Sequence, residues 1–512
     1  MYIQDLSRRD FLKGGLTAVA GLGLVGLAGC SGSGDGSQDA ANSVAGKDTL
    51  VMISMVQNDN FSPFASVGQD KPVHHALFDN LYRFDNDGNV EPMLVVDEQE
   101  DGLVKTLTIR DDAKFSDGNP VTAADVAFSW ETMAADETSG AFVKSYIANV
   151  EAVDDHTVKV TAADPNKLWR NYLAEAVYVV EKATYDASKD YTSESPTGSG
   201  AYVLDSVDNA RTVTLKANES YWNGAPAIKT VQVKAPVDGS TSLVALQTGE
   251  ADYVAQLPID NVANAKEDDS LAMTNFTSWS QELLGMYVGD AKFREAVFHA
   301  IDRDKLIELG NGGSGTPATD MLSKKVMGKY EGISTFTGYD LDLAKQCIAE
   351  SQTDLSQTFE ILTFDSANVA QVIQEDLKEI GVNVQISQVD ANTFFSQLTA
   401  GSMQMFLTGL GTDLQTADAM LQLLFGPASI YKYPVTDDFK AKISALTDAI
   451  NAGEEDLSAQ IKDICDAMAV ECPIVPLYDI DYHDVYRKGL NGVLESSSGT
   501  YVFYFGDMSF EG

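Results

Sequence analysis

Alternation of apolar and polar positions marks the first half of the chain as rich in β-strands. In five segments an apolar residue returns at every second position, and Gly, Asp or Asn follows many of these segments. That pattern predicts half-buried strands closed by turns. The strands are expected at residues 49–56, 104–109, 157–160, 213–215 and 231–233.

Apolar positions three and four residues apart predict helices further along the chain. Thr122 and Asp125 form a pair of the capping-box type at the start of the first helix. The later elements alternate between helix and strand, which predicts an α/β unit with crossover connections. In chain order we expect helices at 122–133, 293–309, 341–351 and 367–380, a strand at 382–389, a helix at 394–400 and a strand at 403–407.

The first thirty residues have the features of an export signal. Arg8 and Arg9 form an adjacent pair, an uncharged stretch follows at 14–29, and that stretch ends at Cys30. The arginine pair is typical of twin-arginine export signals, and the stretch is shorter than the roughly 20 residues of a spanning helix. The residues before Cys30 resemble a bacterial lipobox. We therefore expect residues 1–30 to be a lipoprotein signal peptide, with lipid attached to Cys30.

Composition separates a tether from a globular body. Residues 31–47 are mostly Ser, Gly, Asp, Ala and Asn, so they are expected to form a flexible tether. The chain has 512 residues, 44% of them apolar, which is enough for a full core and suggests two to four domains. Cys347, Cys465 and Cys472 show no metal-ligand spacing and are expected to be buried thiols.

A net charge of −41 excludes nucleic acid and anionic lipid surfaces as partners. The strong acidity also leaves two explanations open. It serves solubility or adaptation to the medium of the host, or it attracts cationic ligands. The charge alone favours the first and names no ligand.

Eight segments, in order, resemble the peptide-, nickel- and opine-type extracytoplasmic solute-binding proteins of ABC importers. The likeness covers nearly the whole chain after the tether. The turn formers at 117–120 and the group at 221–226 also have structural explanations, because they lie between or beside strands. The segments are LYRFDNDGNVEPML at 81–94, LTIRDDAKFSDGNPVTAADVAFSWETM at 107–133, SPTGSGAYVL at 195–204, LKANESYWNGAPAIKTVQV at 215–233, LQTGEADYV at 246–254, FREAVFHAIDRDKL at 293–306, IQEDLKEIGVNVQI at 373–386 and CPIVPLY at 472–478.

The resemblance implies an α/β, periplasmic-binding-protein-like fold of three lobes with a hinged ligand cleft. By this likeness the protein is a monomer outside the cytoplasmic membrane, held by the lipid on Cys30, and it delivers its solute to the permease subunits of an ABC transporter. Closure on the ligand shifts the population toward the closed form. The implied boundaries are 48–83, 197–285 and 476–512 for lobe I, 84–196 for lobe II and 286–475 for lobe III.

Asp413 is the first ligand-contact candidate. Peptide-binding members of the family carry Gly-Trp-x-x-Asp-x-x-Asp-Pro, and the Asp that matches Asp413 holds the α-ammonium group of the peptide. The chain departs from this motif, with Leu410 in place of Trp and with Thr416 and Ala417 in place of Asp-Pro. The pocket wall therefore differs from that of the family. The alternative is that Asp413 caps the following helix.

Two further observations concern the length of the ligand and the wall of the cleft. Dipeptide-binding members have an arginine before the helix that matches 367–380, whereas residues 355–373 here contain neither Arg nor Lys. We therefore expect oligopeptides or a non-peptide amine rather than dipeptides alone. Ser278, Trp279 and Ser280 lie where the chain is expected to return into lobe III and could line the cleft. Core packing of Trp279 is the alternative.

Two other functions compete with peptide binding. Nickel-chelate binding occurs in the resembled family, and His74 and His75 are adjacent, but on the strand we expect there they would point to opposite faces. Five histidines without HxH or HExxH spacing do not favour a metal site. An exported peptide hydrolase would need a nucleophile or metal motif, and neither GxSxG nor HExxH occurs. We therefore expect a binding protein that is not an enzyme and needs no cofactor or metal.

Overall fold

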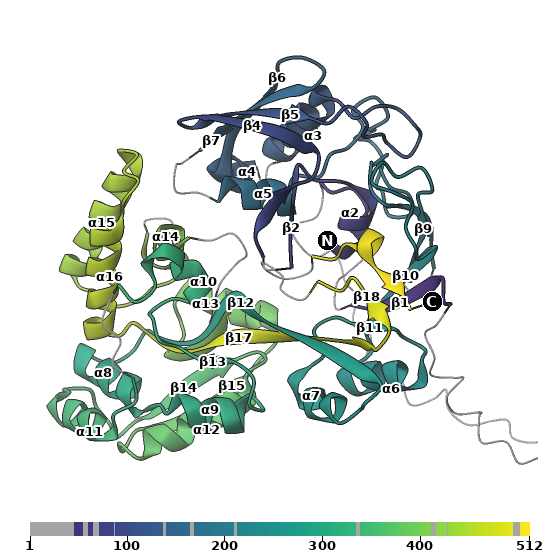
Figure 1. Cartoon of the computed structure of the whole chain (residues 1–512). Helices are drawn as coiled ribbons and strands as arrows, with labels where there is room; N and C mark the ends of the chain where they lie inside the picture. Colours follow the sequence, from purple (N-terminus) through teal and green to yellow (C-terminus); the bar gives the residue numbers. More distant parts are fainter. Residues whose placement is uncertain are drawn as a thin grey trace, which may run out of the picture. The chain divides into compact units, whose positions relative to one another are not determined.

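The computed structural model describes residues 46–54, 60–64, 71–86, 88–136, 140–163, 168–208, 212–333, 338–410, 416–426, 429–494 and 502–511. These described residues form one compact unit, shown in Figure 1. No helix among the described residues has the length and the apolar character needed to cross a bilayer. The export signal, with Arg8, Arg9 and Cys30, lies outside the described residues.

The largest sheet of the described residues has 11 strands and is mixed. Its order is β15-β14-β16-β12-β17-β11-β1-β10-β9-β8, with β13 paired to β17. The strands are β1 (Thr49–Ile53), β8 (Tyr202–Val207), β9 (Val213–Ala217), β10 (Thr230–Lys234), β11 (Tyr253–Val254), β12 (Leu271–Met286), β13 (Thr316–Pro317), β14 (Thr358–Thr363), β15 (Asn383–Gln388), β16 (Met405–Leu410) and β17 (Ile474–Arg487).

Two long antiparallel strands run through the middle of this sheet. β12 has 16 residues and β17 has 14, and they pair from Leu271↔Arg487 to Gly285↔Ile474. Figure 1 shows them joining the part of the sheet that contains β1 and β10 to the part that contains β14 and β15. Apolar alternation did not predict either strand at its full length.

A separate four-stranded sheet, β4-β5-β7-β6, is covered by α3. Thr122 is the N-cap of α3, and its capping box with Asp125 is present, as the sequence predicts. Small two-stranded sheets complete the strand inventory of the described residues. The elements are β2 (Tyr82–Phe84), β3 (Val90–Pro92), β4 (Val95–Asp101), β5 (Val104–Ile109), β6 (Ile147–Ala152), β7 (Thr157–Ala162), β18 (Leu490–Asn491), β19 (Ser509–Phe510), α2 (Lys71–Leu77), α3 (Ala123–Ala135), α4 (Gly140–Tyr146) and α5 (Trp169–Glu175).

The remaining helices include one correction. The helix predicted at 293–309 is two helices, because Ile301 is extended and the Asp302 side chain accepts a hydrogen bond from the backbone N–H of Lys305, which starts a new helix. The helices are α6 (Gly239–Thr248), α7 (Ile259–Lys266), α8 (Ala291–Ala300), α9 (Arg303–Gly310), α10 (Lys324–Met327), α11 (Leu341–Glu350), α12 (Ala367–Lys378), α13 (Ala391–Ala400), α14 (Ala417–Phe425), α15 (Asp437–Asn451) and α16 (Ser458–Glu471), with 3-10 turns at Gly328–Tyr330 and Phe505–Asp507.

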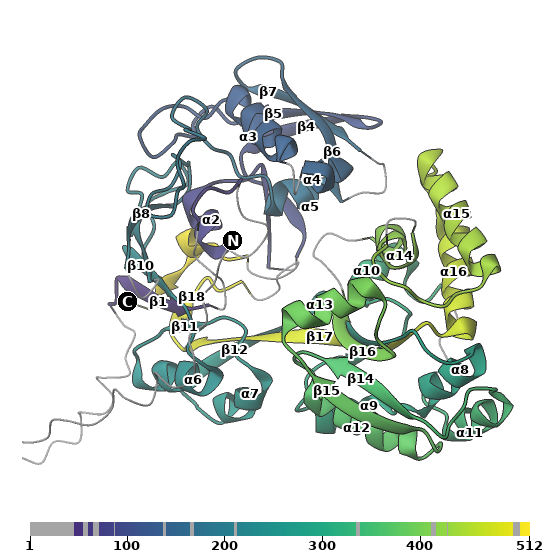
Figure 2. The ribbon, with the colours of Figure 1, turned by 180° about the vertical axis from the view of Figure 1, so that it is seen from behind.

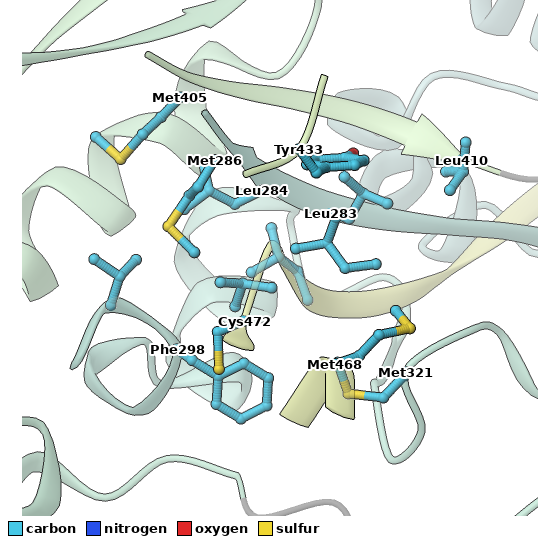
Figure 3. Packing of buried hydrophobic residues seen from close by; sticks show 14 of the residues in the cluster. Leu283, Leu284, Met286, Phe298, Met321, Met405, Leu410, Tyr433, Met468 and Cys472 are labelled. Carbon is cyan, nitrogen blue, oxygen red and sulfur yellow. The ribbon is translucent and has the colours of Figure 1, made fainter. Parts of the chain in front are cut away.

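Four clusters of buried apolar side chains form the core. One draws on residues 283–478 and surrounds β14, β15 and β16, and Figure 3 shows part of it around β12, including Leu284, Met286 and Cys472. A second lies within 81–179 and also contains Val502 and Tyr504. The other two lie around β1 and its neighbouring strands.

The structure settles two smaller predictions. His74 and His75 lie in the helix α2 rather than on a strand, so the argument that they point to opposite faces was wrong. Both are buried, and His74 Nε2 is 3.3 Å from the Asn60 carbonyl oxygen. The three described cysteines are buried free thiols, as expected. Cys472 ends α16 in the left-handed conformation, at φ 45°.

Candidate ligand-binding site

The carboxyl ends of three parallel strands meet at one edge of the sheet. β14 pairs in parallel with β15 on one side and with β16 on the other. The chain passes from β14 through α12 to β15 and then through α13 to β16, and Figure 2 shows α12 and α13 on opposite sides of these strands. The strand order therefore reverses between β14 and β16, because the chain moves from β14 outward to β15 and then returns past β14 to β16. Ligands of open α/β sheets bind at such a switch point.

A bulge in β12 faces this edge. Thr277 pairs with Asp481 and Gln281 pairs with Asp479, so residues 278–280 stand opposite Ile480 alone. The Ser278 hydroxyl accepts a hydrogen bond from the backbone N–H of Ser280 at 3.0 Å, and the Ser323 hydroxyl donates to the Trp279 carbonyl at 2.7 Å. The bulge begins where pairing with β16 ends, at Gln281↔Leu410. The fold thus brings Ser278, Trp279 and Leu410 together, as the ligand-site hypothesis requires.

Trp279 packs partly against the large core cluster, so the core-packing interpretation holds for its ring. Its indole Nε1 is buried and has no hydrogen-bond partner within the described ranges. Leu410 is 9% exposed and belongs to the same cluster. Contact of either side chain with a ligand stays a prediction.

Asp413 lies between β16 and α14, outside the described residues. Both flanks of its loop are described. β16 ends at Leu410, at the switch point, and α14 begins at Ala417 with Thr416 at the N-cap position. Because Asp413 itself lies outside the described residues, its contact with a ligand and its capping of α14 both stay predictions.

Asp479 organises the opposite side of the bulge. Its carboxylate accepts hydrogen bonds from the Gln281 side-chain amide at 3.0 Å and from the backbone N–H of Lys324 at 3.3 Å. Burial raises the pKa of Asp479 to about 6 despite these bonds. This network holds β12, β17 and the start of α10 together. Sequence reasoning did not identify Asp479, although an acid within the apolar run of β17 was a visible signal.

Glu282 was also missed, and it is the most strongly perturbed acid near the bulge. It is 4% exposed. Burial and the Asp365 charge raise its pKa to about 8, although a hydrogen bond from Ser366 acts in the opposite direction. Oε1 of Glu282 has no hydrogen-bond partner among the residues that the structure describes. An acid inside the apolar segment 281–286 was the signal that could have pointed to it.

The described residues contain no group of three or more His, Cys, Asp or Glu side chains that could hold a metal ion. The cleft-edge loop at 364–366, where the resembled dipeptide-binding proteins carry an arginine, contains Asp365 instead.

Known proteins match most of this chain. The model of the bacterial extracellular solute-binding proteins, family 5 Middle, matches residues 89–432. The glutathione-binding protein GsiB of Escherichia coli strain K12 is 25% identical over 491 residues, which covers 88% of this chain and 93% of GsiB.

Solved structures share the fold. CtaP, an ABC transporter substrate-binding protein from Listeria monocytogenes, matches with a TM-score of 0.79 and 20% identity, over 91% of this chain and 100% of CtaP. NikZ from Campylobacter jejuni, in complex with Ni(L-His), gives a TM-score of 0.73 and 21% identity over 90% of this chain and 99% of NikZ. The oligopeptide-binding protein AppA from Bacillus subtilis, in complex with a nonapeptide, gives a TM-score of 0.70 and 20% identity over 91% of this chain and 99% of AppA.

Proposed function

The chain belongs to family 5 of the bacterial extracellular solute-binding proteins, and from this membership we propose that it captures peptides with a free α-ammonium group, above all oligopeptides. The chain is thus a substrate-binding protein of an ABC transporter and not an enzyme. Its mixed α/β fold matches that of other members. The identity of the solute is the proposed part.

The observation that carries the peptide proposal is the place where β16 ends. Its last residue, Leu410, lies at the switch point and pairs with Gln281 beside the bulge at 278–280, and Asp413 follows three positions later in the sequence. A carboxylate there can accept charge-assisted hydrogen bonds from an ammonium group that is shut away from water. The bulge takes residues 278–280 out of the regular ladder between β12 and β17. Relatives whose printed names refer to glutathione and to a nonapeptide support a peptide solute.

Calorimetry tests the role of Asp413. We expect Asp413→Asn to weaken binding of a free tetrapeptide on the order of ten- to a hundredfold, because one charge-assisted contact is lost. The same peptide with an acetylated N-terminus should bind wild type and variant equally weakly. Asp438→Asn, an exposed acid at the start of α15, is the matched control for loss of one charge. Undiminished binding to the Asp413→Asn protein would remove the proposal.

The architecture that goes with this function is a three-lobed body with the boundaries given above. Two features support it. The large cluster within 283–478 and the cluster within 81–179 are separate cores. β12 and β17 each contribute to the large cluster at one end and to the small cluster around Val254 at the other, so they are suited to act as the hinge. Arg8 and Arg9 would direct export, and lipid on Cys30 would hold the protein near the permease subunits.

Mass spectrometry of the freshly purified native protein separates the peptide proposal from its rivals. A co-purified mass that fragments as a peptide supports it. A nickel isotope pattern would instead favour chelate binding, as in the complex of NikZ. A protein without any retained mass is then titrated with peptides, and failure to bind any of them would refute the peptide proposal.

A further inference from the structure

Two adjacent strands place a buried acid beside an exposed glycine, and a second acid lies close by. Glu282 on β12 pairs with Gly409 on β16. β14 lies on the other side of β16, with Ile361 opposite Met405 and Leu362 opposite Phe406. Asp365 lies in the bend that follows β14, and its charge acts on the Glu282 carboxyl. Glu282, Gly409 and Asp365 therefore come from three neighbouring parts of the sheet and its edge.

The glycine leaves the space between the two acids open. Gly409 is exposed, whereas the other residues of β16 are buried. A Cβ atom added there would lie 3.7 Å from Oε2 of Glu282 and 3.1 Å from Cδ1 of Ile480. The side chain of Asp365, in the bend after β14, is exposed. The gap is thus open to solvent at one end and closed by Glu282 at the other.

The charges in the gap are not balanced. Glu282 is nine-tenths buried, and its Oε1 lacks a partner within the described part of the chain. The ionisable groups close to it are the Asp365 carboxyl after β14 and the neutral phenol of Tyr478 on β17, and the Ser366 hydroxyl is the hydrogen-bond donor at the start of α12. No cation is among them. Burial of an unpaired carboxylate is costly, so this acid is held neutral until a positive group approaches.

We propose that Glu282 and Asp365 form a subsite above Gly409 that receives a second positive group of the solute, such as the ammonium or guanidinium of a lysine or arginine side chain. This inference rests on the proposed peptide function and names its class, namely basic peptides. The subsite differs from the α-ammonium site at Asp413, because its acids come from β12 and from the bend after β14 and not from the segment after β16.

Four synthetic tetrapeptides test the subsite by calorimetry. They carry lysine or norleucine at one internal position and a free or acetylated N-terminus, and they are otherwise identical. Wild type should prefer the lysine peptides by on the order of ten- to a hundredfold, since the ion pair adds charge-assisted hydrogen bonds. Glu282→Gln and Asp365→Asn should remove that preference while the preference for a free N-terminus remains. Glu375→Gln, an exposed acid on α12, is the matched control.

Gly409→Val provides a second variant that fills the gap without changing any charge. It should lower the affinity for lysine peptides more than for norleucine peptides. Thermal melting of each variant shows whether it is folded. Asp365→Asn changes an exposed side chain, so its result stands even if a change at the buried Glu282 impairs folding.

The outcomes separate the two proposals. If wild type binds the lysine and norleucine peptides with equal affinity, the subsite proposal is overturned and the peptide-binding proposal stands. Lysine preference that survives in Glu282→Gln and Asp365→Asn also overturns the subsite. If none of the four peptides binds wild type, the peptide function fails, and the subsite fails with it. Release of a proton at pH 7 on binding of lysine peptides, measured in two buffers of different ionisation enthalpy, would support Glu282 as the group that becomes charged.

Discussion

Several buried acids of this protein have raised pKa values even though they accept hydrogen bonds. Asp79 accepts from the Tyr221 hydroxyl at 2.9 Å and from the Trp222 indole at 2.7 Å, yet burial raises its pKa to about 6. Asp484 also reaches about 6, because burial outweighs the hydrogen bond from Tyr253. For these buried acids, the loss of hydration raises the pKa more than the hydrogen bonds lower it. Each such acid makes the folded state less stable at neutral pH than at acid pH.

Glu282 gives the sharpest prediction at the residue scale. Its pKa in the folded protein, about 8, lies above the ordinary value of 4.5, so its stabilising contribution is complete below pH 4.5 and is lost as the pH rises through 8. Glu282→Gln cannot ionise and should lack this loss. Urea unfolding of both proteins from pH 5 to pH 8 should show the variant gaining roughly 2 to 4 kcal/mol relative to wild type. A constant difference across this range would contradict the raised pKa.

Helix starts show which local signals are reliable. The capping box at Thr122 was predicted from sequence and is present, because its hydrogen bonds join residues only three apart. The break between α8 and α9 was missed, since FREAVFHAIDRDKL keeps a helical apolar stripe across it. Tertiary contacts fix the break. The backbone N–H of Asp302 donates to the Asp376 carboxylate on α12 at 3.2 Å.

The cap of α3 gives a prediction at the element scale. Thr122→Ala should lower the free energy of unfolding by about 1 kcal/mol, because the first turn of the helix loses its side-chain partner. Ser444→Ala on the exposed face of α15 is the control, and we expect it to change stability far less, since its hydroxyl bonds only to the Lys440 carbonyl within the helix. Denaturant unfolding followed by circular dichroism measures both. An equal effect of the two variants would contradict the capping role.

At the scale of the whole molecule, β12 and β17 connect separate cores. Leu271 and Val485 belong to the small cluster around Val254, whereas Leu283 and Ile474 belong to the large one. Two strands that share their residues between cores can transmit a change at the switch point along the sheet. The same strands carry the bulge at 278–280, so the proposed ligand site and the proposed hinge share one element.

The anchor is tested on the whole protein. In the native host, Cys30→Ser should abolish labelling of the protein by a radioactive fatty acid and move it out of the membrane fraction, because one thiol carries the proposed lipid. Ser33→Ala in the tether is the control and should remain labelled. Persistent labelling of the Cys30→Ser protein would show that the lipobox interpretation is wrong.

The sequence by itself determined the local and the family-level properties of this protein. Strands such as β5 and helices such as α3 were predicted closely, since apolar period and caps depend on neighbouring residues. The order of eight motifs identified the family that the family model then matched. The resemblance also proposed Ser278, Trp279 and Leu410 as ligand contacts, and these contacts stay predictions.

Only the tertiary structure decided the rest. The pairing of β12 with β17 joins Leu271 to Arg487, far apart in the chain, which no local period encodes. The break before α9 combines the local cap at Asp302 with a hydrogen bond to Asp376 on α12. The sequence alone does not show that Gly409 leaves space beside the buried Glu282, because hydrogen-bond register between β12 and β16 sets which residues face one another.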